Sequence, residues 1–359
     1  MKLPKFRILY VGPLVPHENV LHRFWALERL GQTVFPLDER FFDSGTGRLM
    51  EKLRYRLQSG SVVRDYNETV FKQATGNQVD VVWGDKQVYL RPETLRRLRR
   101  HGIASVDFTI DNPFGPRNDP GWRTYKRSIG EYDLHVLQRD SSLADFMRAG
   151  ARHVMKCQTT FERAAHFPPP AGWSDKDRDR EVSFVGSPYD QRVEFFTRLR
   201  REFEIPLTVS GMRRWAEKLP NDVAEIYTGS ELLATEYRRA IWRSKINLSF
   251  ITHSNLDEYA LKTFEIAGCA GFQIAERSPG HIERFIEDEE IVLFSSVEEC
   301  AAKIRRYLPD EAARERIGWA GHRRAVESGY DNDSQLARVL VELSRVIRED
   351  QISTPGHDR

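Results

Sequence analysis

Two charged residues, Lys262 and Glu265, stand three positions apart in the segment LDEYALKTFEIAGCAGFQIAE, residues 256–276. The apolar spacing predicts a short amphipathic helix over 256–268, which places both side chains on one face. A carboxylate on such a helix can accept both hydroxyls of a ribose, and a lysine one turn earlier can reach a diphosphate. Glutamate and lysine at this spacing are also common on any solvated helix, so the pair alone favours that second interpretation.

The ends of this helix carry their own signals. Asn255 or Asp257 is expected to cap its start, because a short polar side chain accepts the free N–H groups of the first turn. Gly268 and Gly271 are expected to end it. Glu258 is predicted to lie on the same face as the lysine and the later glutamate.

The composition describes a soluble globular protein that is not a dedicated nucleic-acid binder. The chain has 359 residues, of which 40% are hydrophobic and 30% charged, and 55 basic residues balance 53 acidic ones to a net charge of +2. This length favours two domains, which imply a cleft. No apolar run reaches membrane length and no signal-peptide core is present. Three cysteines without metal-ligand spacing are typical of a reducing compartment, so we expect a cytoplasmic protein.

Strand-like and helical patterns alternate in both halves of the chain, which predicts an α/β protein with two doubly wound parallel sheets. The predicted strands are 6–12, 33–37, 79–84, 103–110, 133–138 and 153–156, then 181–187, 206–211, 246–251, 272–275 and 290–294. The segment FPPPAGWSDKDRDR is rich in proline and charge, so a linker is expected at 168–180 between domains 1–167 and 181–350. We expect the last helix to be able to pack back on the N-terminal domain and 351–359 to be a disordered tail.

Fragments of the second half are similar to one known family. They are FVGSPYDQR (184–192), SKINLSF (244–250), KTFEIAGCAGFQIAE (262–276), EEIVLFSSVEECAAKIRRYL (289–308) and GHRRAVESGYD (321–331). Together they resemble the CgeB-like glycosyltransferases, a branch of the group-1 superfamily. The resemblance implies the GT-B fold, two Rossmann-like domains that face a cleft, with a nucleotide-sugar donor held by the C-terminal domain. The first half matches more loosely, through ALERLGQTV (26–34), VDVVWGDKQ (79–87) and the triplet at 111–113.

The resemblance assigns roles to the opening pair. Glu265 corresponds to the carboxylate that takes the donor ribose, and Lys262 to a basic residue near the diphosphate. The superfamily commonly shows two glutamates with seven residues between them, whereas Glu258 and Glu265 are separated by six and Asp257 stands at the usual spacing. The role of the first carboxylate is therefore open.

Further donor-binding candidates follow the predicted strands of the second domain, because ligands of such sheets bind at the carboxyl ends. Gly186 and Ser187 end one strand, where bare N–H groups can receive phosphate, and Arg192 stands where relatives carry a basic ligand. A plain strand-to-helix turn and a solvated arginine are the structural alternatives. The remaining donor-binding candidates are Gly211, His253, Ser254, Asp257 and Thr263. Gly211 can equally make an ordinary turn beside a core Trp215.

Acceptor-side candidates lie in the first domain. Gly12 follows the first predicted strand, and His17 and His22 lie on the turn and helix after it, although a lone histidine there is more often structural. Asp111 ends a hydrophobic strand and precedes Asn112 and a proline. It is read either as a catalytic base or acceptor ligand, or as an Asx turn that caps its own loop.

These observations favour a glycosyltransferase that moves a sugar from a nucleotide-diphosphate sugar to an unknown acceptor, which could be a glycan, a lipid-linked molecule or a small molecule. The Asp-x-Asp matches fall only in polar connecting stretches, so we expect a metal-independent enzyme without a cofactor, and the resemblance leans towards retention of configuration. A nucleotide-sugar epimerase or hydrolase, or a non-catalytic binding protein, are the alternatives. The run RRLRRH at 96–101 could touch a membrane surface, or simply be a solvated helix face.

Overall fold

The computed structural model describes residues 3–42, 47–115, 119–158 and 160–353. The chain divides into two compact units, the first formed by Met1–Gln158 with Asn332–Arg359 and the second by Thr159–Asp331. The division falls earlier than the proline-rich segment at 168–180, because that segment is bonded into the second unit. Phe161 forms a bridge with Asp331, and the indole N–H of Trp173 donates to the carbonyl of Trp242 at 3.0 Å.

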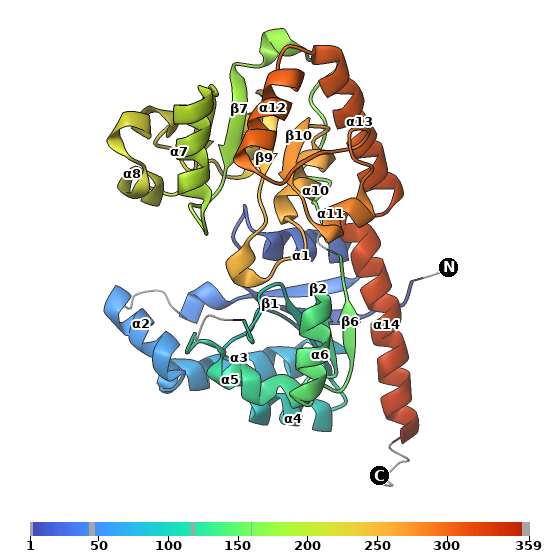
Figure 1. Ribbon diagram of the computed structural model, residues 1–359. Helices are drawn as coiled ribbons and strands as arrows, with labels where there is room; N and C mark the ends of the chain where they lie inside the picture. The colour runs from blue at the N-terminus through green and yellow to red at the C-terminus, as the bar shows by residue number, and fades with distance from the viewer. Residues whose placement is uncertain (1–2, 43–46, 116–118, 159, 354–359) are drawn as a thin grey trace. The chain divides into compact units, whose positions relative to one another are not determined.

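The described part of the first unit contains a six-stranded parallel sheet in the order β2-β1-β3-β4-β5-β6 (Figure 1). The strands are β1 (Arg7–Gly12), β2 (Thr33–Asp38), β3 (Val81–Asp85), β4 (Ala104–Thr109), β5 (Leu134–Leu137) and β6 (Val154–Lys156). Every one lies on a predicted strand. Apolar β-branched runs bounded by turn residues make buried parallel strands, which is why this pattern is readable from sequence.

Helices cover both faces of this sheet. The helices of this unit are α1 (Asn19–Arg29), α2 (Arg48–Leu57), α3 (Ser61–Gly76), α4 (Pro92–Arg100), α5 (Trp122–Ser128), α6 (Asp140–Arg148) and α14 (Asn332–Ser353), with the short 3-10 helices η1 (Glu39–Phe42) and η2 (Ile129–Glu131). Successive residues of a strand point to opposite faces. Tyr10 therefore packs in the core with Leu340 of α14, while Leu9 packs with Val70 and Leu98 of α3 and α4.

The second unit contains a five-stranded parallel sheet in the order β11-β10-β9-β7-β8 within its described residues. Its strands are β7 (Arg180–Val185), β8 (Leu207–Ser210), β9 (Ser244–Ser249), β10 (Gln273–Glu276) and β11 (Val292–Phe294). Its helices are α7 (Arg192–Phe203), α8 (Arg214–Lys218), α9 (Ala234–Trp242), α10 (Leu261–Gly268), α11 (Pro279–Arg284), α12 (Val297–Tyr307) and α13 (Glu311–Glu327), with η3 (Asp175–Asp177), η4 (Asn221–Ile226) and η5 (His253–Asn255). The predicted pair of doubly wound α/β sheets is confirmed.

The packing of the second unit places α10 against the sheet. One core joins Phe184, Phe196 and Ile304 from β7, α7 and α12, and another joins Phe264 of α10 to Leu293 of β11. The side chain of Ser296 accepts the N–H of Glu299 and caps α12.

Two predicted boundaries differ from the structure. The helix expected over 256–268 begins only at Leu261, because Leu256 adopts a left-handed φ of 56° that ends η5 and turns the chain. Residues 351–353 of the expected tail belong to α14, which continues through Ser353, and 354–359 lie outside the described residues. Among the described residues no helix is long and apolar enough to cross a membrane.

Candidate functional site

The carboxyl ends of β7, β8 and β9 meet at one edge of the second sheet, because all three strands are parallel. Gly186 follows β7 and Gly211 follows β8 at this edge. Gly211 has a φ of 150°, and a Cβ added to it would lie 2.1 Å from the carbonyl oxygen of Gly186. Only glycine permits this approach. The indole N–H of the fully buried Trp215 donates to the same carbonyl at 2.7 Å, so these loops are fixed by packing.

Lys262 lies beside the turn that follows β7. A Cβ on Gly186 would lie 3.6 Å from Cε of Lys262. The half-buried ammonium donates to the hydroxyl of Tyr237 at 3.1 Å, and its Nζ is 4.6 Å from the centre of that ring. Burial lowers the pKa of Lys262, the Glu265 carboxylate opposes this, and the positive charge of Arg192 lowers it further.

Glu265 is buried one turn after the lysine on α10. Its Oε2 accepts the hydroxyl of Tyr237 at 2.7 Å, and its Oε1 lies 3.9 Å from Nε2 of His166. Burial lowers the pKa of His166, and this favours the neutral form of the ring. Burial and the nearby carboxylate raise the pKa of Tyr237, so the phenol remains a donor. The predicted placement of Lys262 and Glu265 on one helix is therefore confirmed, and Tyr237 joins their charged groups.

Arg192 begins α7 and is more enclosed than a solvated helix residue. Its Nη2 donates to the carbonyls of Phe250 and Ile251 at 3.3 and 3.1 Å, and its Nη1 donates to the carbonyl of Ser187 at 3.2 Å. Burial lowers the pKa of Arg192, while Asp190 and other acids oppose this. The guanidinium thus ties the turn after β7 to the end of β9, and its charge acts on Lys262 from that position.

The loop after β9 is organised by carboxylates. The Asp190 carboxylate accepts the N–H groups of His253 and Ser254 at 3.0 and 3.2 Å. The exposed His253 ring has its Nε2 2.6 Å from Oε1 of Glu276, whose Oε2 accepts the N–H of Ile251. This loop lines an open pocket of about 660 Å³ together with Phe195. The backbone donors of 253 and 254 are thus already bonded.

The start of α10 is held by an imidazole. Nε2 of His281 accepts the N–H of Ala260 at 3.3 Å and lies 3.0 Å from the hydroxyl of Thr263, while Nδ1 lies 2.7 Å from the carbonyl of Glu276. The ring is therefore neutral with its proton on Nδ1. Its burial lowers the pKa of His281 to about 4.

The structure corrects three predictions about α10. Asn255 and Asp257 lie before the helix and do not cap it, because Asn255 donates to Asp257 at 3.0 Å and the helix starts four residues after the aspartate. Glu258 precedes the helix, so it does not share the face of Lys262. Thr263 is completely buried, with its hydroxyl 2.9 Å from that of Ser249, so it positions the helix instead of contacting a donor.

The first unit holds the acceptor-side candidates. The Asp111 carboxylate forms an ion pair with Lys86, and this attraction raises the pKa of Lys86 although burial opposes it. The Asx turn belongs to Asn112, whose side chain accepts the N–H of Phe114 at 2.9 Å. The carboxylate of Asp111 is thus half-buried and paired instead of capping its own loop.

The other acceptor-side candidates differ in exposure. His17 is exposed before α1, whereas His22 is buried with its ring 5.4 Å from that of Trp25. The role of His22 as an acceptor contact stays a prediction. A Cβ on Gly12 would lie 2.7 Å from Cγ1 of Val20, so glycine at this position allows α1 to pack against β1.

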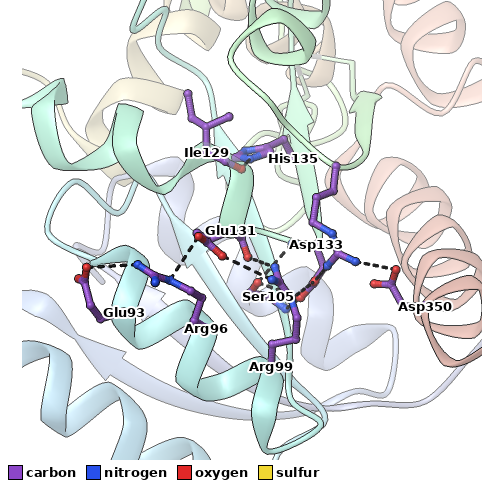
Figure 2. Close-up of polar contacts among 10 residues, drawn as sticks. Glu93, Arg96, Arg99, Ser105, Ile129, Glu131, Asp133, His135 and Asp350 are labelled. Atoms are coloured by element: carbon purple, nitrogen blue, oxygen red, sulfur yellow. Dashed lines mark hydrogen bonds and ion pairs between the residues drawn. The ribbon is translucent and has the colours of Figure 1, made fainter. Parts of the chain in front are cut away.

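The cationic run at 96–101 is largely neutralised within the first unit. Arg96 pairs with Glu93 and Glu131 at 3.3 Å each, and Arg99 pairs with Glu131 and Asp133 at 3.4 and 3.2 Å. Figure 2 shows both arginines turned toward these carboxylates. The run is therefore a salt-bridged helix face, the plainer of the two interpretations that the sequence allows.

Tyr237, His166 and Glu276 are absent from the sequence predictions. Tyr237 is 28 positions from Glu265, and nothing in its own helix marks it as a partner. His166 precedes the three prolines and was assigned to the end of the first domain. Within the described residues no group of three or more His, Cys, Asp or Glu side chains is placed to hold a metal ion.

Solved structures of glycosyltransferases share this fold. Sucrose-phosphate synthase of Thermosynechococcus elongatus superposes with a TM-score of 0.65 at 13% identity, over 96% of this chain and 99% of its own. HepE of Anabaena in complex with UDP superposes with a TM-score of 0.59 at 13% identity, and the match covers 94% of this chain and 100% of HepE. The UDP-forming α,α-trehalose-phosphate synthase of Burkholderia xenovorans superposes with a TM-score of 0.60 at 15% identity, and the match covers 95% of this chain and 98% of the synthase. The fold is therefore that of the GT-B glycosyltransferases.

The sequence adds a second, independent indication. A family model described as glycosyl transferase-like matches residues 191–340, which is less than half of the chain and contains Arg192, Lys262 and Glu265. No curated protein matches the chain's sequence. The fold and the matched region together support a glycosyltransferase of the GT-B type.

Proposed function

We propose that the protein transfers a sugar from a nucleoside-diphosphate sugar, held by the second unit, to an acceptor. The observation that carries this proposal is the ammonium of Lys262 beside Gly186, joined through Tyr237 to Glu265 one helical turn later. In the donor the ribose is joined directly to the diphosphate. A carboxylate for the ribose hydroxyls and an ammonium for the diphosphate are therefore needed close together, as Glu265 and Lys262 are.

The chemical step requires stabilisation of the leaving diphosphate. The bond between the anomeric carbon and the diphosphate oxygen breaks, and negative charge accumulates on that oxygen. Lys262 and the nearby charge of Arg192 supply a positive field at the first turn of α7, whose N-terminus adds to it. Burial makes this field stronger than it is in water, because the local dielectric is low.

The same residues explain how the donor is recognised. The Glu265 carboxylate has about four acceptor positions, and the Tyr237 hydroxyl occupies one of them. We propose that this carboxylate receives the ribose hydroxyls of the donor. We propose, as the resemblance suggests, that the transfer retains the anomeric configuration. From the sequence we also propose that it needs no metal and that Asp111, at the end of its strand, contributes to the acceptor side.

The proposal is tested by turnover. The intact chain is incubated with a panel of nucleotide sugars, with and without candidate acceptors and with and without EDTA, and nucleotide release is followed. We expect release that depends on an acceptor, survives EDTA, and falls at least about a hundredfold in Lys262→Ala and Glu265→Ala. NMR of the first product gives the anomeric configuration. Equal release without any acceptor indicates a hydrolase, conversion to another nucleotide sugar without net release indicates an epimerase, and tight binding without either indicates a binding protein. Each of these outcomes contradicts a transferase.

A further inference from the structure

An exposed apolar face lies on the first unit, on α2. Leu49, Leu53 and Leu57 are 79%, 46% and 50% exposed, and Met50 beside them is 56% exposed. The leucines are four positions apart, so they form one row along the helix. Large apolar side chains gathered on one exposed face mark an interaction surface.

The opposite side of α2 holds it to the unit. Arg54 is buried and its Nη1 donates to the carbonyl of Phe42 at 2.9 Å, while the hydroxyl of Tyr55 donates to Asp119 at 2.8 Å. Gln58, at the helix end, accepts the N–H of Thr124 in α5 at 2.7 Å. The attachment is therefore mainly polar, and the leucine row is left outward. Figure 1 shows α2 at the margin of the first unit.

Exposed basic residues lie beside the leucine row and on the neighbouring helix α5. Lys52 and Arg56 are exposed on α2 and are themselves four positions apart, which places them along one border of the row. Arg123 and Arg127 are exposed on α5, to which the end of α2 is bonded. None of these four side chains forms an ion pair or hydrogen bond with another side chain in the part of the chain that the structure describes.

We propose that α2 docks the first unit on the surface of an anionic lipid bilayer. An apolar row bordered by unpaired cations matches a surface whose interior is hydrocarbon and whose headgroups are negative. A nucleic acid would also attract the cations, but it has no apolar layer in which the leucine side chains could be buried. The cations of the 96–101 run contribute less, since Arg96 and Arg99 are already paired with carboxylates. This inference does not depend on the transfer chemistry of the second unit.

Co-sedimentation of the full chain with vesicles tests the proposal. We expect binding to vesicles of phosphatidylcholine mixed with phosphatidylglycerol, and weak binding to phosphatidylcholine alone. Leu53→Glu is expected to weaken binding about tenfold or more, and Lys52→Gln about fivefold at low salt. Met147→Glu is the matched control, because Met147 is 51% exposed on α6 of the same unit. Its binding is expected to equal that of the unchanged protein.

A fluorescent label reports insertion directly. Cys157, Cys269 and Cys300 are all buried, so a thiol-reactive, environment-sensitive dye on the folded protein marks an introduced cysteine selectively. The dye on Leu53→Cys is expected to shift to the blue with anionic vesicles, and the dye on Met147→Cys is not. Absence of sedimentation with either vesicle overturns the proposal, as does binding that Leu53→Glu leaves unchanged. A dimer in vesicle-free solution that Leu53→Glu disperses would assign the face to a second copy and overturn it too.

Discussion

The hydroxyl of Tyr237 lies 2.7 Å from Oε2 of Glu265 and donates to it. The same hydroxyl accepts from the ammonium of Lys262 at 3.1 Å, so one phenol joins the two charges that the sequence marks for donor binding. A buried carboxylate and a half-buried lysine require such a partner, because each is costly to desolvate alone. The relationship makes Tyr237 a positioning residue for both.

Removing this hydroxyl tests the positioning role. In Tyr237→Phe the ring still packs against Lys262, but Glu265 loses a donor, which costs about 1–3 kcal/mol. We expect kcat/KM for the nucleotide sugar to fall about tenfold to a hundredfold, with most of the change in KM. Steady-state kinetics on Tyr330→Phe gives the control, since the hydroxyl of Tyr330 makes a 3.5 Å contact with the carbonyl of Arg284 and no shorter one to the residues that the structure describes. Unchanged kinetics in Tyr237→Phe would remove Tyr237 from the site.

The approach of two loops at the sheet edge predicts a selective glycine effect. Gly211→Ala places a Cβ 2.1 Å from the carbonyl oxygen of Gly186 and displaces the turn beside Lys262. We expect a loss of unfolding free energy of about 3 kcal/mol or more by urea denaturation, because backbone must move. Gly229→Ala has a φ of 75° with open space around the new Cβ, and we expect a cost of only about 1–2 kcal/mol. Equal costs in the two variants would contradict the close approach.

The buried His281 predicts a pH dependence of stability. Its pKa is lowered to about 4 by burial, whereas the unfolded chain titrates near 6.5. Between these values the unfolded state binds a proton that the folded state does not, so the unfolding free energy decreases as pH falls from 6.5 to 4. A gap of this size corresponds to about 3 kcal/mol. Glu287, with a pKa lowered to about 2, loses its contribution only at lower pH.

Urea denaturation at several pH values between 7 and 4 measures this slope. His281→Gln is expected to be less stable at pH 7 and to show a flatter profile, because the titrating ring is gone. His101→Gln, which changes an exposed ring, is expected to keep the steep profile. Parallel profiles in all three proteins would show that His281 is not the group responsible.

In the first unit, the two oxygens of Asp85 receive Arg23 at 2.6 and 2.8 Å, and Tyr10 donates to the same carboxylate at 2.7 Å. All three are buried. Asp85→Asn leaves a buried guanidinium without its charge partner, which is expected to lower the unfolding free energy by about 3–5 kcal/mol. Glu68→Gln, at the surface pair with Arg97, is expected to change it by less than about 1 kcal/mol. Circular dichroism in urea distinguishes the two; a small effect for Asp85→Asn would indicate that water reaches the pair.

The sheets could be predicted because their signal is local. Runs such as 79–84 and 181–187 are apolar and bounded by turn residues, and each became a buried parallel strand. Lys262 and Glu265 were predictable together because three positions on one helix always share a face. The start of that helix was not predictable, because the N–H of Ala260, just before it, is received by His281, 21 residues away, and no local side chain caps it. Tyr237 was missed for the same reason.

Exposure was equally hidden in the sequence. The arginines at 96–101 read as a cationic surface until their partners Glu131 and Asp133, more than thirty residues away, are placed beside Arg99. The exposure of the leucines of α2 was not predictable, because periodicity shows that a helix has an apolar face but not whether anything covers it. The exposure of the arginines and that of the leucines depend on tertiary contacts, and the spacing of residues in the sequence does not encode these contacts.

The central claim is that the second unit binds a nucleoside diphosphate through Lys262 and Glu265. Calorimetric titration of the intact protein with UDP and with GDP tests it most directly. We predict binding of one of them that weakens at least about tenfold in Lys262→Met and in Glu265→Gln. Lys245→Met, a change at the amino end of β9, is predicted to bind as the unchanged protein does. No binding at millimolar nucleotide, or equal affinity in Lys262→Met, would contradict the claim.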